Sequence, residues 1–150
     1  TSIMILHNTI LVSVSKAPRE NEQPKILRIQ WAVINSEMVL TRGFSFFIQD
    51  EQQDDGEDQS CNTNKQEVIQ YGKPIEYVLK KFIYDYGQCG IIAGSDIESD
   101  LAILEAEAKR LGIVPESKIK EKVQINSENK CPDLNSLIKS YIRQKSGIFV

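Results

Sequence analysis

The stretch from Gly90 to Gly112 constrains the fold more than any other part of the chain, because it joins a short apolar run to an amphipathic helical pattern. The run Ile91-Ile92-Ala93 ends at a glycine, and the apolar residues Leu101, Leu104, Ala108 and Leu111 then recur at three- and four-residue steps. Ser95 or Asp96 can cap the predicted helix, and Gly112 marks its end. A strand that leads directly into a helix is half of a β–α–β crossover. We therefore expect a sheet with at least one parallel pair of strands.

The first fifty residues predict three further strands with short connections. β-forming residues run from Ile10 to Val14, where the polarity alternates, and then from Ile26 to Ile34 and from Met38 to Ile48. Residues 16–25 are polar and contain two prolines, so they predict a loop, and residues 35–37 predict a turn. This pattern is typical of an antiparallel meander. We expect the strand at residues 90–93 to run parallel beside the strand that begins at Ile10.

Helical patterns complete the chain. One amphipathic helix is predicted from Pro74 to about Gly87, a short strand at Lys122–Ile125, and a last helix after Pro132. The aromatic residues Phe44, Phe46 and Phe47 cannot all face inward on one strand, so one of them is expected under a helix or in an apolar surface patch. The expected core consists of Ile10, Val12, Ile29, Trp31, Val33, Phe46, Val78, Leu79, Phe82, Ile92, Leu101, Leu104 and Leu137.

Length and composition indicate one domain over residues 1–150. Residues 49–64 are acidic and aperiodic, which predicts a mobile surface loop, and their spacing does not match a calcium-binding loop. Cys61, Cys89 and Cys131 are odd in number and lack the spacing of a zinc site, so free thiols are expected. No apolar run has the length of a membrane span. We expect an intracellular protein, nuclear or cytoplasmic, without membrane contact.

Several segments carry a resemblance to a known family. I-L-V-S-V-S and I-L-R-I-Q-W-A-V are followed by G-K-P-I-E-Y-V-L-K-K-F and then by I-I-A-G-S-D-I-E-S-D-L-A-I-L. In this order they resemble the ribonuclease H-like domain of the DEDD 3′–5′ exonucleases. That family has Asp-x-Glu on its first strand and H-N-x-x-F-D-x-x-x-L after its parallel strand. The resemblance implies an α/β fold, a mixed sheet of three antiparallel strands plus a parallel strand, flanked by helices.

The catalytic positions of that family are mostly altered in this chain. Ser13 and Ser15 stand at the Asp-x-Glu positions, Ser95 and Asp96 stand at the His-Asn positions, and only Asp100 stands where a catalytic aspartate would be. After residue 133 the chain has no acid and no histidine for the last motif. Active members hold two divalent metal ions between four carboxylates. The resemblance therefore implies a domain that has no catalytic residues, no metal site and no cofactor.

The charge distribution leaves the function open. Residues 1–100 carry nine basic against fifteen acidic side chains (−6), whereas residues 101–150 carry nine against six (+3). Lys118, Lys120, Lys122 and Arg143 are candidates for contacts with nucleic acid, and a solvated surface of mixed charge is the alternative. Three functions remain: an inactive domain that assembles with a protein partner in a nucleic-acid-related complex; an RNA- or single-stranded DNA-binding domain that uses the former substrate groove; and an active exonuclease completed by residues outside this chain.

Overall fold

The computed structural model describes residues 8–18, 24–49, 72–113, 120–126 and 132–146. The predicted acidic loop lies outside these residues except for Gln49, and so do Cys61, Lys118 and Cys131. Within the described ranges no helix has the length and apolar character needed to cross a membrane. The structure identifies Cys89 as a buried free thiol, and burial raises its pKa to about 12.

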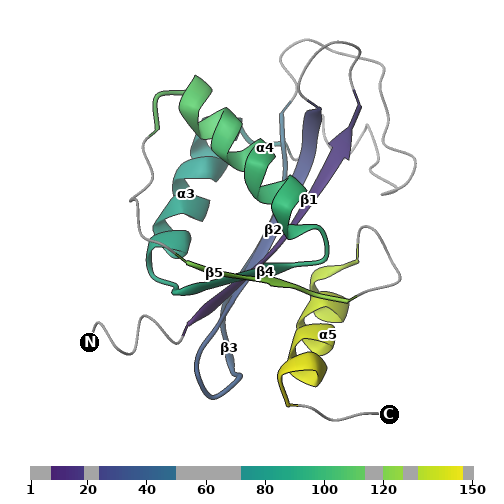
Figure 1. Ribbon diagram of the computed structural model, residues 1–150. Coiled ribbons are helices and arrows are strands. Elements are labelled where there is room, and N and C mark those ends of the chain that lie inside the picture. Colours follow the sequence, from purple (N-terminus) through teal and green to yellow (C-terminus); the bar gives the residue numbers. More distant parts are fainter. Residues whose placement is uncertain (1–7, 19–23, 50–71, 114–119, 127–131, 147–150) are drawn as a thin grey trace.

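A five-stranded mixed sheet in the order β3-β2-β1-β4-β5 forms the centre of the fold (Figure 1). The strands are β1 (Thr9–Ala17), β2 (Lys25–Ile34), β3 (Leu40–Phe47), β4 (Ile91–Gly94) and β5 (Glu121–Gln124). β1, β2 and β3 pair antiparallel, whereas β4 runs parallel to β1 and β5 runs parallel to β4. The predicted meander and the predicted parallel strand beside β1 are both confirmed.

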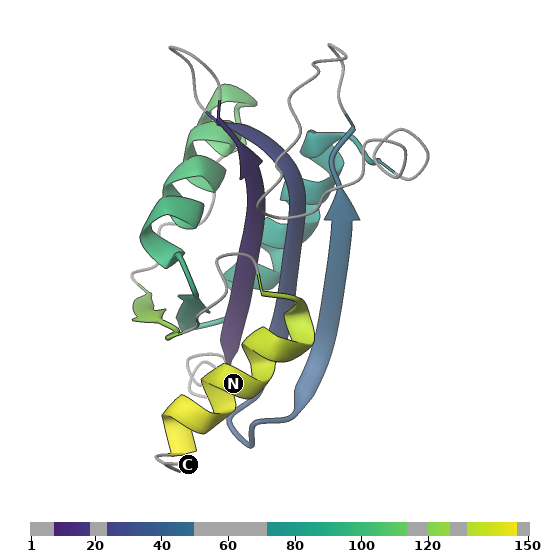
Figure 2. The same cartoon turned by 90° about the vertical axis from the view of Figure 1, so that its right-hand side faces the viewer.

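Helices cover both faces of the sheet, as Figures 1 and 2 show. α3 (Ile75–Gly87) and α4 (Ile97–Arg110) pack on one face around the larger apolar cluster, which includes Val12 and Trp31. α5 (Leu134–Ser146) covers the other face, where Leu137 joins a smaller cluster. The Tyr141 hydroxyl on α5 is hydrogen-bonded to the Thr9 side chain on β1 at 3.0 Å. The period-two and period-3.6 patterns of the sequence thus correspond to one helix-covered sheet.

Gly94 allows β4 to end close beside β1. A Cβ atom added at this residue would lie 2.7 Å from the backbone oxygen of Val12, which is closer than carbon and oxygen can approach. Only glycine fits there without displacing one of the two strands. Because α4 begins three residues later, at Ile97, this close approach also fixes where the first turn of α4 meets β1.

A buried acid joins α3 to β2 and β3. The carboxylate of Asp85 accepts a hydrogen bond from the Trp31 indole nitrogen at 2.8 Å and forms an ion pair with the Arg42 guanidinium at 2.9 Å. Asp85 is 1% exposed, so both of these contacts are needed to compensate for the loss of water around the carboxylate. Arg42 also lies over the Phe44 ring, 5.2 Å from its centre.

The structure corrects several sequence predictions. Lys16 and Ala17 belong to β1 and Lys25 belongs to β2, so the loop predicted at residues 16–25 is shorter. The third strand starts at Leu40, because Met38 has a φ of 64° in the preceding turn. Phe46 is only half-buried, because β3 is an edge strand with a neighbour on one side. Every other member of the expected core is buried.

Candidate functional site

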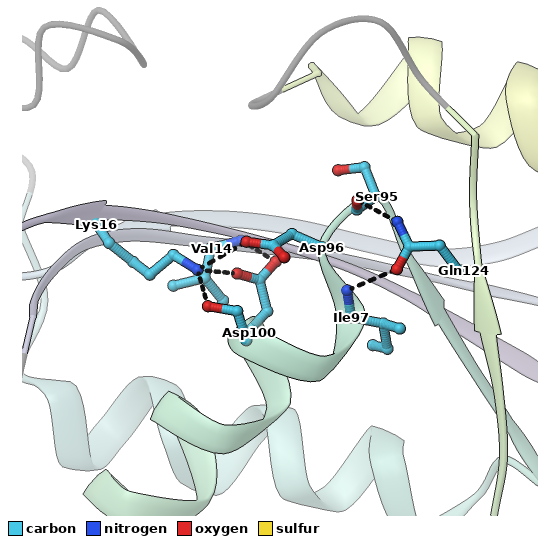
Figure 3. Close-up of polar contacts among 8 residues, drawn as sticks. Val14, Lys16, Ser95, Asp96, Ile97, Asp100 and Gln124 are labelled. Atoms are coloured by element: carbon cyan, nitrogen blue, oxygen red, sulfur yellow. Dashed lines mark hydrogen bonds and ion pairs between the residues drawn. The ribbon is translucent and has the colours of Figure 1, made fainter.

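Asp100 lies in the first turn of α4, where it is buried against β1 (Figure 3). Its Oδ1 accepts a hydrogen bond from the Lys16 ammonium at 2.6 Å, and its Oδ2 accepts one from the Val14 backbone N–H at 3.3 Å. Both carboxylate oxygens are therefore engaged by β1. The contact joins two segments that lie more than eighty residues apart in the sequence.

The Lys16 ammonium has three acceptors. Besides Asp100, it donates to the Ser99 hydroxyl at 2.8 Å and to the Asp96 carboxylate at 3.2 Å (Figure 3). An ammonium group has three N–H donors, so these contacts satisfy it completely. Its side chain is 19% exposed, and that of Asp100 is 4% exposed. The pair is therefore shielded from water. An ion pair exposed at the surface would contribute little to stability.

Burial and charge act in opposite directions on this pair. Burial raises the pKa of the Asp100 carboxyl, and the Lys16 contact and the Val14 N–H oppose that rise. Burial also acts to lower the pKa of Lys16, but the hydrogen bond and charge of Asp100, with a smaller contribution from Asp96, raise it above 10.5. Lys16 is therefore charged at neutral pH. Its contribution to stability is fully present below pH 10.5 and is lost as the pH rises through the higher pKa of the folded state.

Gln124 on β5 caps α4. Asp96 occupies the predicted N-cap position, but its side chain makes no capping hydrogen bond. Instead the Gln124 amide oxygen accepts from the Ile97 backbone N–H at 3.4 Å, and its amide nitrogen donates to the Ser95 backbone oxygen (Figure 3). The cap thus comes from a strand rather than from the helix itself. This arrangement leaves the Asp96 carboxylate available for Lys16.

Ser13 and Ser15 lie on the opposite face of the sheet from α4. Side chains alternate along a strand, so these serines share the face of Leu11, on the α5 side, while Val14 faces α3 and α4. Among the described residues, neither hydroxyl contacts Asp100. The structure therefore does not bring the side chains of Ser13 and Ser15 together with that of Asp100.

The side chains of this region do not fit a pair of divalent metal ions. Within the described ranges, no three His, Cys, Asp or Glu side chains lie close enough together to hold one ion. Asp100 already has a cation at 2.6 Å, and a neutral serine hydroxyl is a poor Mg²⁺ ligand compared with a carboxylate.

The predicted basic residues are divided between the two faces. Lys118 lies outside the described residues. Lys120 lies over the Tyr86 ring of α3 at 4.3 Å, and Lys122 pairs with Glu98 of α4 at 3.5 Å. Arg143 belongs to α5, on the other side of the sheet. Contact of these residues with nucleic acid stays a prediction.

Lys16 is not among the site residues that the sequence predicts, because its polar, proline-containing surroundings predict a loop. A usable signal was present. Continuing the alternation of β1 two residues beyond Val14 places Lys16 on the same face, under the helix that carries Asp100. The role of Gln124 had no such signal, since its partners Ser95 and Ile97 lie about thirty residues earlier.

Comparison with known proteins gives the fold. No protein-family model and no curated protein matches the sequence. Among solved structures, an exonuclease I is similar at 11% sequence identity and a TM-score of 0.63; the match covers 78% of this chain and 28% of the exonuclease chain. A product-bound exonuclease I is similar at 10% identity and a TM-score of 0.65, and that match covers 96% of this chain and 34% of the exonuclease chain. A 3′-exonuclease with 3′-end-specific recognition of histone mRNA stem-loop is similar at 12% identity and a TM-score of 0.56, and the match covers 95% of this chain and 83% of the exonuclease chain.

The chain thus spans well under half of the exonuclease I chains and most of the 3′-exonuclease. At such low identity the similarity shows the fold alone. The mixed five-stranded sheet flanked by helices is the exonuclease-like, ribonuclease H-like α/β fold that the sequence pattern predicted.

Proposed function

We propose that this chain is a catalytically inactive exonuclease-like domain that acts as a protein–protein interaction module in a nucleic-acid-related complex. The observation that carries the proposal is the contact of 2.6 Å between Lys16 and Asp100. Asp100 is the only acid at a catalytic position of the resembled family, and a lysine of the same chain already neutralises it. A metal ion would have to displace this buried lysine.

The neighbouring acids support the same conclusion. Asp96 shares the Lys16 ammonium, and Glu98 pairs with Lys122 at 3.5 Å. Each acid in or next to the first turn of α4 therefore has a lysine partner. Two Mg²⁺ ions bring four positive charges, which active enzymes balance with carboxylates. Lys16 adds positive charge at the place where negative charge is required, so an alternative metal site built from these three acids is disfavoured.

Nuclease activity is the direct test. We expect the purified chain to leave 5′-labelled single-stranded DNA and RNA intact in Mg²⁺ and in Mn²⁺, as resolved on denaturing gels. Asp100→Ala and the exposed control Glu105→Ala should behave like the wild type. Shortening from the 3′ end that disappears in Asp100→Ala but persists in Glu105→Ala would contradict the proposal. Shortening that persists in both variants would instead indicate a contaminating nuclease.

An exposed apolar turn supports the interaction role. Met38 and Val39 lie in the turn between β2 and the edge strand β3, and Leu40 is the first residue of β3; they are 36%, 52% and 50% exposed. Three consecutive exposed apolar side chains beside a sheet edge are typical of a surface that another protein covers. Tyr77 and Tyr84 on α3 are also exposed, at 48% and 64%.

Substitution of the turn tests this role. We expect Leu40→Glu to abolish co-purification of specific proteins with the tagged full-length protein, because a carboxylate in an apolar interface loses its hydration. Its thermal unfolding should stay unchanged, since the side chain is exposed. Lys109→Glu, an exposed change at the end of α4, serves as the control. Quantitative mass spectrometry that finds the same proteins with wild type, Leu40→Glu and Lys109→Glu would exclude this surface as the interface.

A further inference from the structure

Four polar side chains form a block on the α5-side face of the sheet, away from the Lys16–Asp100 pair. Ser13 and Ser15 come from β1, and Gln30 and Arg28 lie directly opposite them on β2. All four share the face of Leu11 and Ala32, which belong to the smaller apolar cluster. Directly opposite side chains lie about 5 Å apart and successive ones on the same face about 7 Å apart, so the four are immediate neighbours.

The block contains hydrogen-bonding atoms that no described residue satisfies. Ser15 Oγ, Gln30 Nε2 and Arg28 Nε are buried and have no hydrogen-bond partner. Ser15 is 1% exposed and Gln30 is 6% exposed. Buried polar groups nearly always have a partner, and leaving one unpaired is costly. Three unpaired atoms on neighbouring side chains therefore point to something that binds among them.

The charges around the block favour an anion. β1, β2 and β3 contain Lys16, Lys25, Arg28 and Arg42 and no acidic residue at all. Lys16 is paired with Asp100 and Arg42 with Asp85, on the other face. Arg28 lies over the Phe47 ring at 5.7 Å, and it has no ion pair with a described residue. A guanidinium group has donors and no acceptor, so its partner must supply acceptor oxygens.

We propose that Ser13, Ser15, Arg28 and Gln30 bind a phosphate group, either free phosphate or the phosphate of a nucleotide. A planar guanidinium, an amide N–H and hydroxyls form a donor set suited to a tetrahedral oxyanion. The same set is unsuited to a divalent cation, which requires carboxylates. This inference does not depend on the proposed loss of nuclease activity, because it rests on the opposite face of the sheet.

A titration with sodium phosphate tests the proposal, at constant ionic strength maintained with sodium chloride. In ¹H–¹⁵N spectra of the 150-residue chain, the Gln30 side-chain amide and the Arg28 Nε–H report on the site directly. We expect both signals to shift saturably. Arg28→Met should weaken binding about tenfold. The exposed control Lys109→Met should bind as the wild type does.

Ser15→Ala provides a second variant in case Arg28→Met does not fold. It removes one donor of small volume, and we expect a loss of a few-fold in affinity. Adenosine monophosphate, titrated in parallel, distinguishes the two sources: tighter binding than phosphate indicates a nucleotide, and equal binding indicates free phosphate. Signals that do not shift saturably, or that shift equally in Arg28→Met, overturn the proposal and assign the unpaired atoms to buried water.

Discussion

Replacing Lys16 by methionine should lower the free energy of unfolding by about 3 kcal/mol at pH 7. Methionine keeps much of the side-chain volume but removes the cation from Asp100, whose side chain is 4% exposed. The carboxylate is then left with the Val14 N–H as its remaining partner among the described residues. Urea unfolding, followed by far-ultraviolet circular dichroism, measures the effect. Lys109→Met, an exposed change on α4, should alter stability by less than about 0.5 kcal/mol.

The pH dependence gives this prediction a distinctive form. Burial raises the pKa of Asp100, and loss of Lys16 removes a group that now opposes the rise. An acid whose pKa is higher in the folded state destabilises that state only when ionised. The deficit of Lys16→Met should therefore shrink as the pH falls toward 3.8, the ordinary value for aspartate. Addition of Asp100→Asn should restore much of the lost stability at pH 7. A deficit that is independent of pH and unaffected by Asp100→Asn would mean that the charge pair is not its cause.

Asp85→Ala is expected to cost about 3 kcal/mol, because it leaves the Trp31 indole N–H buried without its acceptor and creates a cavity. Arg42, whose side chain is 47% exposed, can regain water and adds less to the loss. Asp85→Asn keeps an acceptor oxygen and should cost less than Asp85→Ala. Denaturant unfolding with Trp31 fluorescence measures stability at the site of the change.

Tyr84→Ala is the matched control for Asp85→Ala. The tyrosine is the preceding residue of α3 and is 64% exposed, so its removal tests the effect of substitution in this helix without touching the buried network. We expect a change below about 0.5 kcal/mol. Equal costs for Tyr84→Ala and Asp85→Ala would show that helix propensity, rather than the contact with Trp31, determines the result.

Most of the fold followed from local pattern. β1 alternates in polarity, and the run at Ile91 passes directly into a helical repeat, so the antiparallel meander and the parallel pairing of β4 with β1 could be inferred. The failures occurred where tertiary contacts override composition. Lys16 lies in a polar, proline-containing stretch, yet β2 holds it in the sheet through its pairing with Ile26. Phe46 fits a core strand but belongs to an edge.

The candidate site was predicted less well, because resemblance gives the order of residues and not the faces on which they lie. The resemblance places Ser13, Ser15 and Asp100 at catalytic positions of one family, but alternation along β1 places the serines on the α5 side. The partners of Lys120 and Lys122 come from α3 and α4, far away in the sequence. Nothing in a local window indicates such pairs.

The cap that Gln124 supplies to α4 affects the order in which the chain can fold. The first turn of α4 is completed by a residue of β5, and β5 must itself pair with β4 before its side chain reaches Ile97. During synthesis, the β4–α4 unit therefore leaves the ribosome without its cap and obtains it only once residue 124 has emerged. We therefore expect the helix that carries Asp100 to become stable late, as part of a cooperative unit with both parallel strands.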